Sequence, residues 1–295
     1  MLYYEKGIFD KKSISSKAFI LLAIILGCTL LAMFPITLLD LTAPVKNAAV
    51  VLRTTIFIQD LFMFILAAYI AQDLFFKEPI KKAMCLKMPL LITLALGIMA
   101  IFTISPLTDA LGLLNQKLQF PDSMEWLNSW IRSSENSAQN TVNIILNTDQ
   151  WPAFIANILI LGVLAGVSEE IMFRGIIQKM LIQKMRNPHV AIFITAFIFS
   201  AIHLQFLGFF PRLVMGMLLG YLYYFSKSIW VPIFAHGANN FLTIVVTPCP
   251  MNKDWKFLQS LYHLNFPIAL IIVFLLVCVG CVYAIKLIEQ KKDLS

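Results

Sequence analysis

Apolar residues along the chain fall into runs that are long enough to cross a lipid bilayer. A transmembrane helix needs roughly 20 mostly apolar residues, because the hydrocarbon core is about 30 Å thick. The pattern predicts about eight such runs, covering residues 18–39, 50–72, 88–106, 152–173, 190–208, 211–226, 229–247 and 265–287. All are expected to be helices, since a segment in lipid must satisfy its own backbone hydrogen bonds. The sequence therefore predicts an all-α, polytopic membrane protein.

The composition agrees with this pattern. Hydrophobic residues make up 59% of the chain and charged residues 13%, whereas a soluble domain is about 45–50% apolar and about 25% charged. The net charge of +7 could indicate a nucleic-acid partner, but the basic residues form no basic domain and lie in short loops. We therefore expect the lipid bilayer as a partner and no nucleic acid. A single transmembrane domain is expected over residues 1–295, with its motif-bearing core at 150–250.

The basic residues predict the orientation, because lysine and arginine collect in cytoplasmic loops. One set of connections is rich in them: Lys6, Lys11, Lys12, Lys17, Lys77, Lys81, Lys82, Lys87, Lys179, Lys184, Arg186, Lys227, Lys286, Lys291 and Lys292. The opposite set has fewer, and they are scattered: Lys46, Lys117, Arg132, Arg212, Lys253 and Lys256. Both termini are thus expected in the cytoplasm, in keeping with an even number of spans. The short loops and the lack of appended domains are typical of a prokaryotic plasma-membrane protein.

The long connection over residues 107–150 is expected outside and is net acidic. Within it, Trp126, Leu127, Trp130 and Ile131 have spacings that place them on one face of a helix. Such a helix can lie in the outer membrane interface or act as a lid over a substrate. The interfacial position is the favoured interpretation.

Ionisable groups inside a membrane span are costly, so each needs a partner or a function. The fourth predicted span ends with two adjacent carboxylates, Glu169 and Glu170, followed by Arg174. Glu170 and Arg174 are four residues apart and can form an ion pair along one helix face. Glu169 is about 100° around the helix and is left to face a cavity. The alternative is that both carboxylates extend to the cytoplasmic edge of the membrane.

Two further spans carry polar groups of complementary chemistry. The fifth contains His203, and the seventh contains His236 and Asn240 one helical turn apart. Imidazole and carboxamide groups side by side can hold a carbonyl oxygen as it gains negative charge. A hydrogen-bonded packing histidine and an interhelical polar clamp are the structural alternatives. Three separate spans that each bring such a group favour a common site formed by helices 4, 5 and 7.

Other polar or small residues in the spans are expected to be structural. Arg53 is expected to extend its side chain to the outer edge of the membrane, and Asp60 to pair with a neighbouring helix rather than to join the site. Gly216 and Gly220 form a small-xxx-small pattern that lets a neighbouring backbone approach closely.

At these residues the chain resembles the CPBP family, which comprises CAAX prenyl proteases and bacteriocin-processing proteins and is also called the Abi family. The family has three motifs, EExxxR, FxxxH and HxxxN. They occur here in order as Glu169-Glu170…Arg174, Phe199…His203 and His236…Asn240. Each motif is weak alone, but the set in this order, each on its own predicted span, is a specific signal.

The resemblance implies an intramembrane endopeptidase with a cavity that opens to the cytosol. Glu169 and His203 would activate a water molecule, His236 and Asn240 would stabilise the oxyanion, and Glu170 and Arg174 would brace the site. Zinc could bind two histidines and a glutamate, but the chain has no HExxH motif and an amide beside His236 suits an oxyanion hole better. No cofactor is therefore expected, and the choice between a glutamic and a metallo type of peptidase stays open.

The expected substrate is a membrane-associated peptide or protein, which in some relatives carries a lipid. A non-catalytic bacteriocin-immunity or peptide-binding membrane protein would use the same fold and cavity, and is the alternative function. A proton-relaying transporter is disfavoured, because the sequence has no repeat symmetry or paired broken helices.

Overall fold

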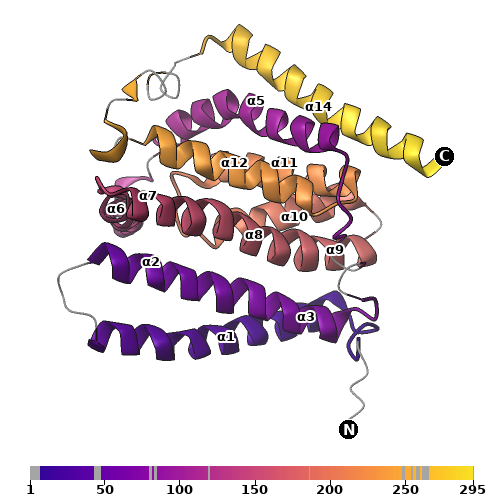
Figure 1. Cartoon of the computed structure of the whole chain (residues 1–295), viewed down its shortest axis with the longest axis horizontal. Helices are drawn as coiled ribbons and strands as arrows, with labels where there is room; N and C mark the ends of the chain where they lie inside the picture. Colours follow the sequence, from indigo (N-terminus) through magenta and orange to yellow (C-terminus); the bar gives the residue numbers. More distant parts are fainter. Residues whose placement is uncertain are drawn as a thin grey trace.

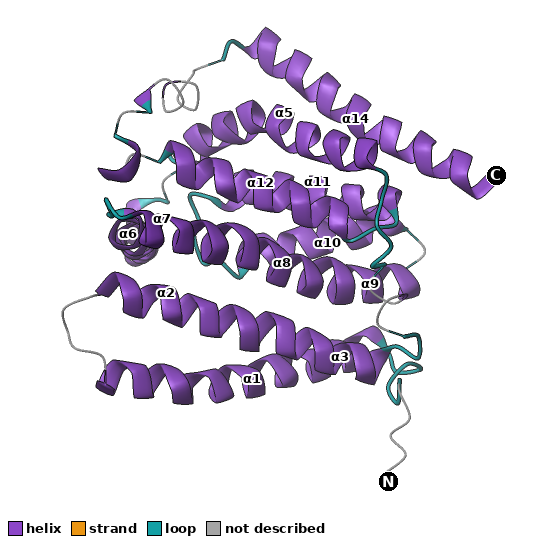
Figure 2. Cartoon of the chain, in the orientation of Figure 1, coloured by secondary structure: helices purple, strands orange, loops and turns teal. Residues whose placement is uncertain are grey.

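The computed structural model describes residues 7–42, 48–79, 82, 85–118, 120–185, 187–247, 250–253, 255–256, 260 and 266–294. Every regular element within these ranges is helical (Figure 2), which confirms the predicted all-α class. The elements are α1 (Ile14–Thr42), α2 (Ala48–Gln59), η1 (Asp60–Leu66), α3 (Ala67–Phe75), α5 (Leu91–Asn115), η2 (Asp122–Met124), α6 (Glu125–Leu146), α7 (Trp151–Asn157), η3 (Ile158–Leu164), α8 (Ala165–Glu170), η4 (Ile171–Gln178), α9 (Lys179–Lys184), α10 (Pro188–Ala201), α11 (Phe209–Ser226), α12 (Trp230–Val246), η5 (Pro250–Asn252) and α14 (Ile268–Leu294).

Short π-helical stretches join several of these elements into longer rods. Elements α2, η1 and α3 form one rod over Ala48–Phe75, and α7, η3, α8, η4 and α9 form another over Trp151–Lys184. A π-helical turn widens the hydrogen-bonding pattern and occurs frequently at functional sites. The two adjacent glutamates end α8, which lies between two such stretches.

Within the described part of the chain, five rods are long and apolar enough to cross a membrane, as expected for an integral membrane protein: Ile14–Leu39, Ala48–Phe75, Leu91–Asn115, Trp151–Lys184 and Ile268–Lys292. Their outward faces carry large apolar side chains, such as Leu91, which is 81% exposed, and Phe34, which is 76% exposed. Lipid would cover these faces. The shorter apolar helices α10 and α12 coincide with two further predicted spans, and the total of eight spans stays a prediction.

The helices form three adjacent groups (Figure 1). Helix α1 packs on the α2–η1–α3 rod at one edge, and α5 packs on α14 at the other. The α7–α9 rod and helices α10, α11 and α12 lie between them. Helix α12 contacts η3 and α8 on one side and α5 on the other. The helices that carry the three motifs are therefore at the centre of the bundle.

One end of the bundle gathers most of the lysines, and we call it the lysine-rich end. There, Lys17 Nζ donates to the carbonyl oxygen of Phe75 at 3.4 Å, and Lys179 Nζ lies 3.4 Å from a carboxylate oxygen of Glu78. The same end carries further described lysines: Lys11, Lys12, Lys77, Lys82, Lys87, Lys184, Lys227, Lys286, Lys291 and Lys292. The α6 helix lies at the opposite end (Figure 1), which we call the lysine-poor end.

The predicted span 190–208 is wrong at its C-terminal end. Helix α10 starts at Pro188, where the Asn187 side chain accepts a hydrogen bond from the backbone N–H of His189. It ends at Ala201 after only 14 residues. Leu204 then has a φ of 54°, a left-handed conformation that cannot continue a right-handed helix. At 1.5 Å per residue, α10 is about 21 Å long, which is shorter than the hydrocarbon core.

Arg53 does not extend to the membrane edge as predicted. Its side chain is 8% exposed, and its Nε donates to Asn157 Oδ1 at 2.6 Å while Nη2 donates to the carbonyl oxygen of Ile145 at 2.7 Å. Ile145 lies in the last turn of α6, where carbonyl groups lack partners within the helix. Burial is favourable because the guanidinium stabilises this helix end and so anchors α6 to α2.

Candidate active site

The two adjacent glutamates of α8 have different surroundings. Glu170 is fully buried, whereas Glu169 lines a cavity with 16% of its side chain exposed. This is the arrangement expected from their offset around the helix axis. Within one sequence motif, Glu170 thus faces the packed interior and Glu169 faces the open cavity.

Glu170 starts a buried polar ladder. Arg174 Nη1 donates to Glu170 Oε1 at 2.6 Å, and Arg174 Nη2 donates to the carbonyl oxygen of Gly216 at 3.0 Å. One turn further, Gln178 Nε2 donates to the carbonyl oxygen of Gly220 at 2.9 Å. The predicted ion pair is present, and the two glycines of α11 permit the close approach because they carry no side chain. This ladder, Glu170, Arg174 and Gln178, fixes the α8–η4 segment against α11.

His236 on α12 reaches both glutamates. Its Nδ1 lies 2.8 Å from Glu170 Oε1, and its Nε2 lies 3.8 Å from Glu169 Oε2. A carboxylate can only accept, so Nδ1 carries the hydrogen and Nε2 faces Glu169 and the cavity. The helices approach this closely because Gly166 of α8 faces Gly237 of α12, where an added Cβ would lie 3.2 Å from the backbone nitrogen.

Asn240 lies one turn beyond His236 and also lines the cavity. Its Nδ2 donates to the carbonyl oxygen of Leu161 at 3.2 Å, and its Oδ1 accepts from Asn239 at 3.4 Å. The carboxamide is therefore held in place from two sides. One of its two N–H bonds is used by Leu161, and the second can serve a bound group.

His203 lies two residues beyond the end of α10. Its Nδ1 donates to the carbonyl oxygen of Phe199 at 2.7 Å, so Nε2 is the free acceptor in the neutral ring. The Phe199 ring lies between the site residues, with its centroid 5.1 Å from that of His203, 6.0 Å from that of His236 and 5.1 Å from the Arg174 guanidinium carbon. The phenylalanine of the second motif thus packs the two histidines and the buried arginine together.

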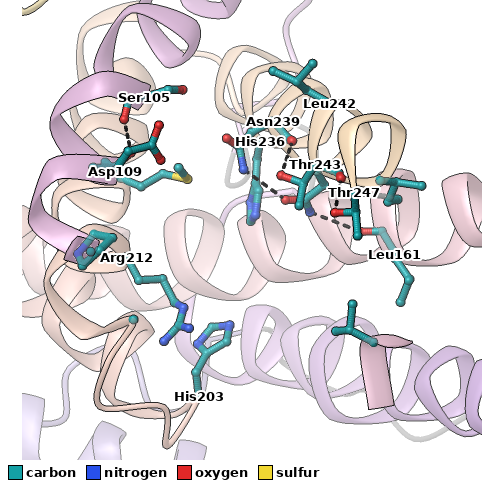
Figure 3. Close-up of a pocket in the computed structure, with 18 of the residues that line it drawn as sticks. Ser105, Asp109, Leu161, His203, Arg212, His236, Asn239, Leu242, Thr243 and Thr247 are labelled. Atoms are coloured by element: carbon teal, nitrogen blue, oxygen red, sulfur yellow. Dashed lines mark hydrogen bonds between the residues drawn. The ribbon is translucent and has the colours of Figure 1, made fainter. Parts of the chain in front are cut away.

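These groups surround a cavity of about 840 Å³. Glu169, His203, His236 and Asn240 line it, whereas Glu170 and Arg174 lie behind its wall. Figure 3 shows His203 on one side of the cavity and His236, with residues of the following turns of α12, on another. The structure therefore brings the six predicted residues together as four cavity groups and two buried supports.

Three charged residues of the cavity were not predicted: Asp109 of α5, Glu135 of α6 and Arg212 of α11. Arg212, in the first turn of α11, points into the cavity beside His203 (Figure 3) and is held by Gln205, whose Oε1 accepts from Nη2 at 2.6 Å. Glu135 of α6 also lines the cavity and accepts from the backbone N–H of Leu207 at 2.8 Å. The prediction assigned Arg212 to an outer loop. An arginine within the apolar stretch Phe209–Val214 was a signal that it needed a partner.

Helix α6 covers part of the cavity. Ser134 Oγ donates to the carbonyl oxygen of Leu204 at 2.8 Å, and Val142 and Leu146 line the cavity. On its outward face, Trp126 is 70% exposed and Trp130 is 49% exposed. The helix therefore has the amphipathic character predicted for an interfacial helix. It also lies over the site, as the alternative prediction of a lid requires.

Asp60 lies next to the site. It begins the π-helical stretch η1, is 6% exposed and lies beside the hydroxyl group of Ser168, the residue before Glu169. Its neighbour is on another helix, as predicted. Its Oδ2 has no hydrogen-bond partner among the described residues, so the carboxyl group supports the site helix with one oxygen left unsatisfied.

The residues of the site do not form a ready metal centre. Nowhere in the described ranges do three His, Cys, Asp or Glu side chains converge closely enough to hold a metal ion. One nitrogen of His236 is engaged by Glu170 and one nitrogen of His203 by a backbone carbonyl. A zinc ion would need further side-chain movement to gain three protein ligands.

Comparison with known proteins finds two partial matches. The family of type II CAAX prenyl endopeptidases, Rce1-like, matches residues 151–242, which contain all three motifs. The chain is also 34% identical over 96 residues to YdiL of Bacillus subtilis (strain 168), named as a candidate membrane peptidase. That match covers 32% of this chain and 39% of YdiL, and no solved structure matches. The family match covers the part of the chain that carries all three motifs, and both matches support the predicted similarity to the CPBP family.

Proposed function

We propose that the protein is an intramembrane endopeptidase of the CAAX-protease type, in which Glu169 activates the attacking water. The observation that carries the proposal is the convergence of Glu169, His203, His236 and Asn240 on one cavity deep in a bundle of membrane-spanning helices. Ionisable groups at this depth are expected to serve a function. The family match supports a peptidase.

The geometry supports a division of roles. Glu169 takes a proton from water, and the water oxygen attacks the carbonyl carbon of the peptide bond. Asn240 Nδ2 and an N–H of His236 donate to the carbonyl oxygen as it becomes negative. His236 can donate from Nε2 only when both ring nitrogens carry hydrogen, a state that the carboxylate of Glu170 stabilises at Nδ1. The C–N bond then breaks as the carbonyl re-forms, and the proton held by Glu169 passes to the leaving amine.

His203 and Arg212 form the opposite wall of the cavity (Figure 3). His203 presents Nε2 and can orient the water for Glu169. Arg212 keeps N–H groups directed into the cavity beside it and can hold a backbone carbonyl or carboxylate of the substrate. A membrane-associated peptide or protein, with or without a lipid, is the proposed substrate class, because the remaining wall is largely apolar.

The proposed enzyme is of the glutamic type, with no metal in the reaction. This choice rests on the lack of three converging ligand side chains among the described residues and on the placement of Asn240, which suits a hydrogen-bond donor better than a ligand. The same polar groups could serve as a non-catalytic peptide-binding or immunity site, so the test must separate binding from cleavage.

The test is cleavage of a library of membrane-anchored and lipidated peptides by the purified protein in detergent. Wild type is compared with Glu169→Ala, each with and without a strong zinc chelator. Cleavage that is lost in Glu169→Ala but survives chelation is the expected result. Loss on chelation would instead establish a metallopeptidase. Cleavage by Glu169→Ala at the wild-type rate would overturn the assigned role, and peptide binding without cleavage by wild type would favour the immunity or binding function.

A further inference from the structure

The cavity is closed toward the lysine-rich end. Between Glu169 and the lysine-rich end, the buried ladder of Glu170, Arg174 and Gln178 fills the space between η4 and α11. Each of the three residues is 0% exposed. Apolar side chains complete the seal, with Phe173 2% exposed and Ile176 fully buried. A peptide cannot reach Glu169 from this end without disrupting the core.

The cavity is open toward the lysine-poor end. Helix α10 stops after 14 residues, and the non-helical residues 202–208 continue to the end of α5, where Asn115 Nδ2 donates to the carbonyl oxygen of Phe206 at 2.6 Å. Non-helical backbone at membrane depth is tolerated where it lines a water-filled cavity. The exposed lining residues lie on this side: Asp109, Leu113, Gln116, Val142 and Thr243.

The charges assign a side of the membrane to each end. Twelve described lysines lie at the lysine-rich end: Lys11, Lys12, Lys17, Lys77, Lys82, Lys87, Lys179, Lys184, Lys227, Lys286, Lys291 and Lys292. At the lysine-poor end the exposed described basic residues are Lys117, Arg132, Lys253 and Lys256. Positively charged loops stay in the cytoplasm, so the closed end faces the cytoplasm and the open end faces away from it.

We propose that the site is entered from the extracytoplasmic side of the membrane. Its substrate is then a peptide segment exposed on that side, either an exported peptide or the outer end of a membrane-anchored protein. The statement about substrate rests on the proposed function, whereas the direction of the opening does not. The arrangement differs from the cytosolic opening that the family resemblance implied, because the Lys-rich end and the cavity mouth are at opposite ends of the same helices.

Single-cysteine labelling tests the direction without a substrate. All five native cysteines are replaced by alanine, and one cysteine is introduced at the cavity mouth as Leu113→Cys or, as a second variant, Gln116→Cys. Both positions are exposed; Leu113 lies in the last turn of α5, and Gln116 directly follows the helix. Gln183→Cys, exposed near the end of α9, is the uncharged matched control at the lysine-rich end. A membrane-impermeant maleimide is added to sealed spheroplasts and again after permeabilisation.

We expect both mouth cysteines to be labelled as fully before permeabilisation as after it, and Gln183→Cys only after it. Labelling of Gln183→Cys in sealed spheroplasts, or of the mouth cysteines only after permeabilisation, would overturn the proposal. Cleavage is then followed with an impermeant peptide added to right-side-out and inside-out vesicles of the wild-type protein. Cleavage confined to right-side-out vesicles supports both proposals. Mouth labelling from outside with no cleavage in either vesicle would keep the direction of entry and reject the peptidase.

Discussion

Two polar regions meet at α8, and they use the same residue types in opposite ways. In the buried ladder, Glu170 and Arg174 contact each other and the packed backbone, and solvent does not reach them. In the cavity, Glu169 and Arg212 are partly exposed and keep hydrogen-bonding capacity toward the open space. The surroundings, and not the residue type, therefore separate a structural group from a reactive one.

Neutralising each glutamate in turn should separate the two regions with the largest effect. Glu169→Gln keeps the size of the side chain but cannot take a proton, so cleavage is expected to fall about 10²–10⁴-fold. The melting temperature should stay close to that of wild type, because the contact between Glu169 and His236 Nε2 is long, at 3.8 Å, and His236 keeps its hydrogen bond to Glu170. Glu170→Gln should instead lower the melting temperature, since Arg174 loses its carboxylate. Rates on a peptide substrate and thermal unfolding in detergent measure the two effects.

If Glu169→Gln unfolds and Glu170→Gln does not, the assignment of the two glutamates is reversed. Equal losses of stability in both variants would show that the cavity is a packed region of the native protein. Either result would contradict the separation of the two regions.

Removal of the buried cation should have the next largest effect. Arg174→Met leaves the Glu170 carboxylate buried without its guanidinium, and breaking a buried ion pair costs about 3–5 kcal/mol. The free energy of unfolding, measured with denaturant in detergent, should fall by this amount. Arg132→Met, which removes an exposed arginine from α6, is the matched control and should change the free energy by less than about 0.5 kcal/mol. If Arg174→Met lowers the free energy of unfolding by as little as the control does, the pair is not buried in the native protein.

The anchoring of α6, which covers part of the cavity, provides a third test. Arg53→Met removes two hydrogen bonds from a buried guanidinium, to Asn157 and to the last turn of α6. Hydrogen bonds to charged groups contribute about 1.5–3 kcal/mol. We expect faster amide hydrogen exchange across α6 and little change in α8, with Lys117→Met as the control at an exposed position of the same end. Unchanged exchange in α6 would mean that other contacts hold the cover in place.

Much of this arrangement could be predicted from the sequence, because its main signals are local. The apolar runs predict helices, and the four-residue spacing of Glu170 and Arg174 predicts an ion pair on one helix face. What the sequence did not predict depends on contacts between distant segments. The end of α10 at Ala201 and the contacts of Arg53 and Arg212 with residues on other elements or loops have no signature in their own neighbourhood. Hydropathy showed that these arginines were unusual but not which groups they would meet.

The smallest effect is expected at Gln178, and it tests whether the charge or the position of the ladder residues stabilises the protein. Gln178 repeats the geometry of Arg174 one turn away, since each side chain donates to a glycine carbonyl of α11, at Gly220 and Gly216. Gln178→Met keeps the volume and removes one neutral hydrogen bond, which contributes about 0.5–1.5 kcal/mol. It also removes an oxygen, Gln178 Oε1, that has no partner among the described residues, so the net loss should be about 1 kcal/mol or less. Cleavage should stay at the wild-type rate.

Comparison of Gln178→Met with Arg174→Met then isolates the charge, because burial, partner type and helix face are shared. A loss in Gln178→Met as large as that in Arg174→Met would mean that close packing of η4 on α11 stabilises the ladder and that the buried ion pair adds nothing. A clear difference between the two would attribute the additional stability to the Glu170–Arg174 pair. The same pair would then be the element that holds His236 at Glu170 and seals the cavity from the lysine-rich end.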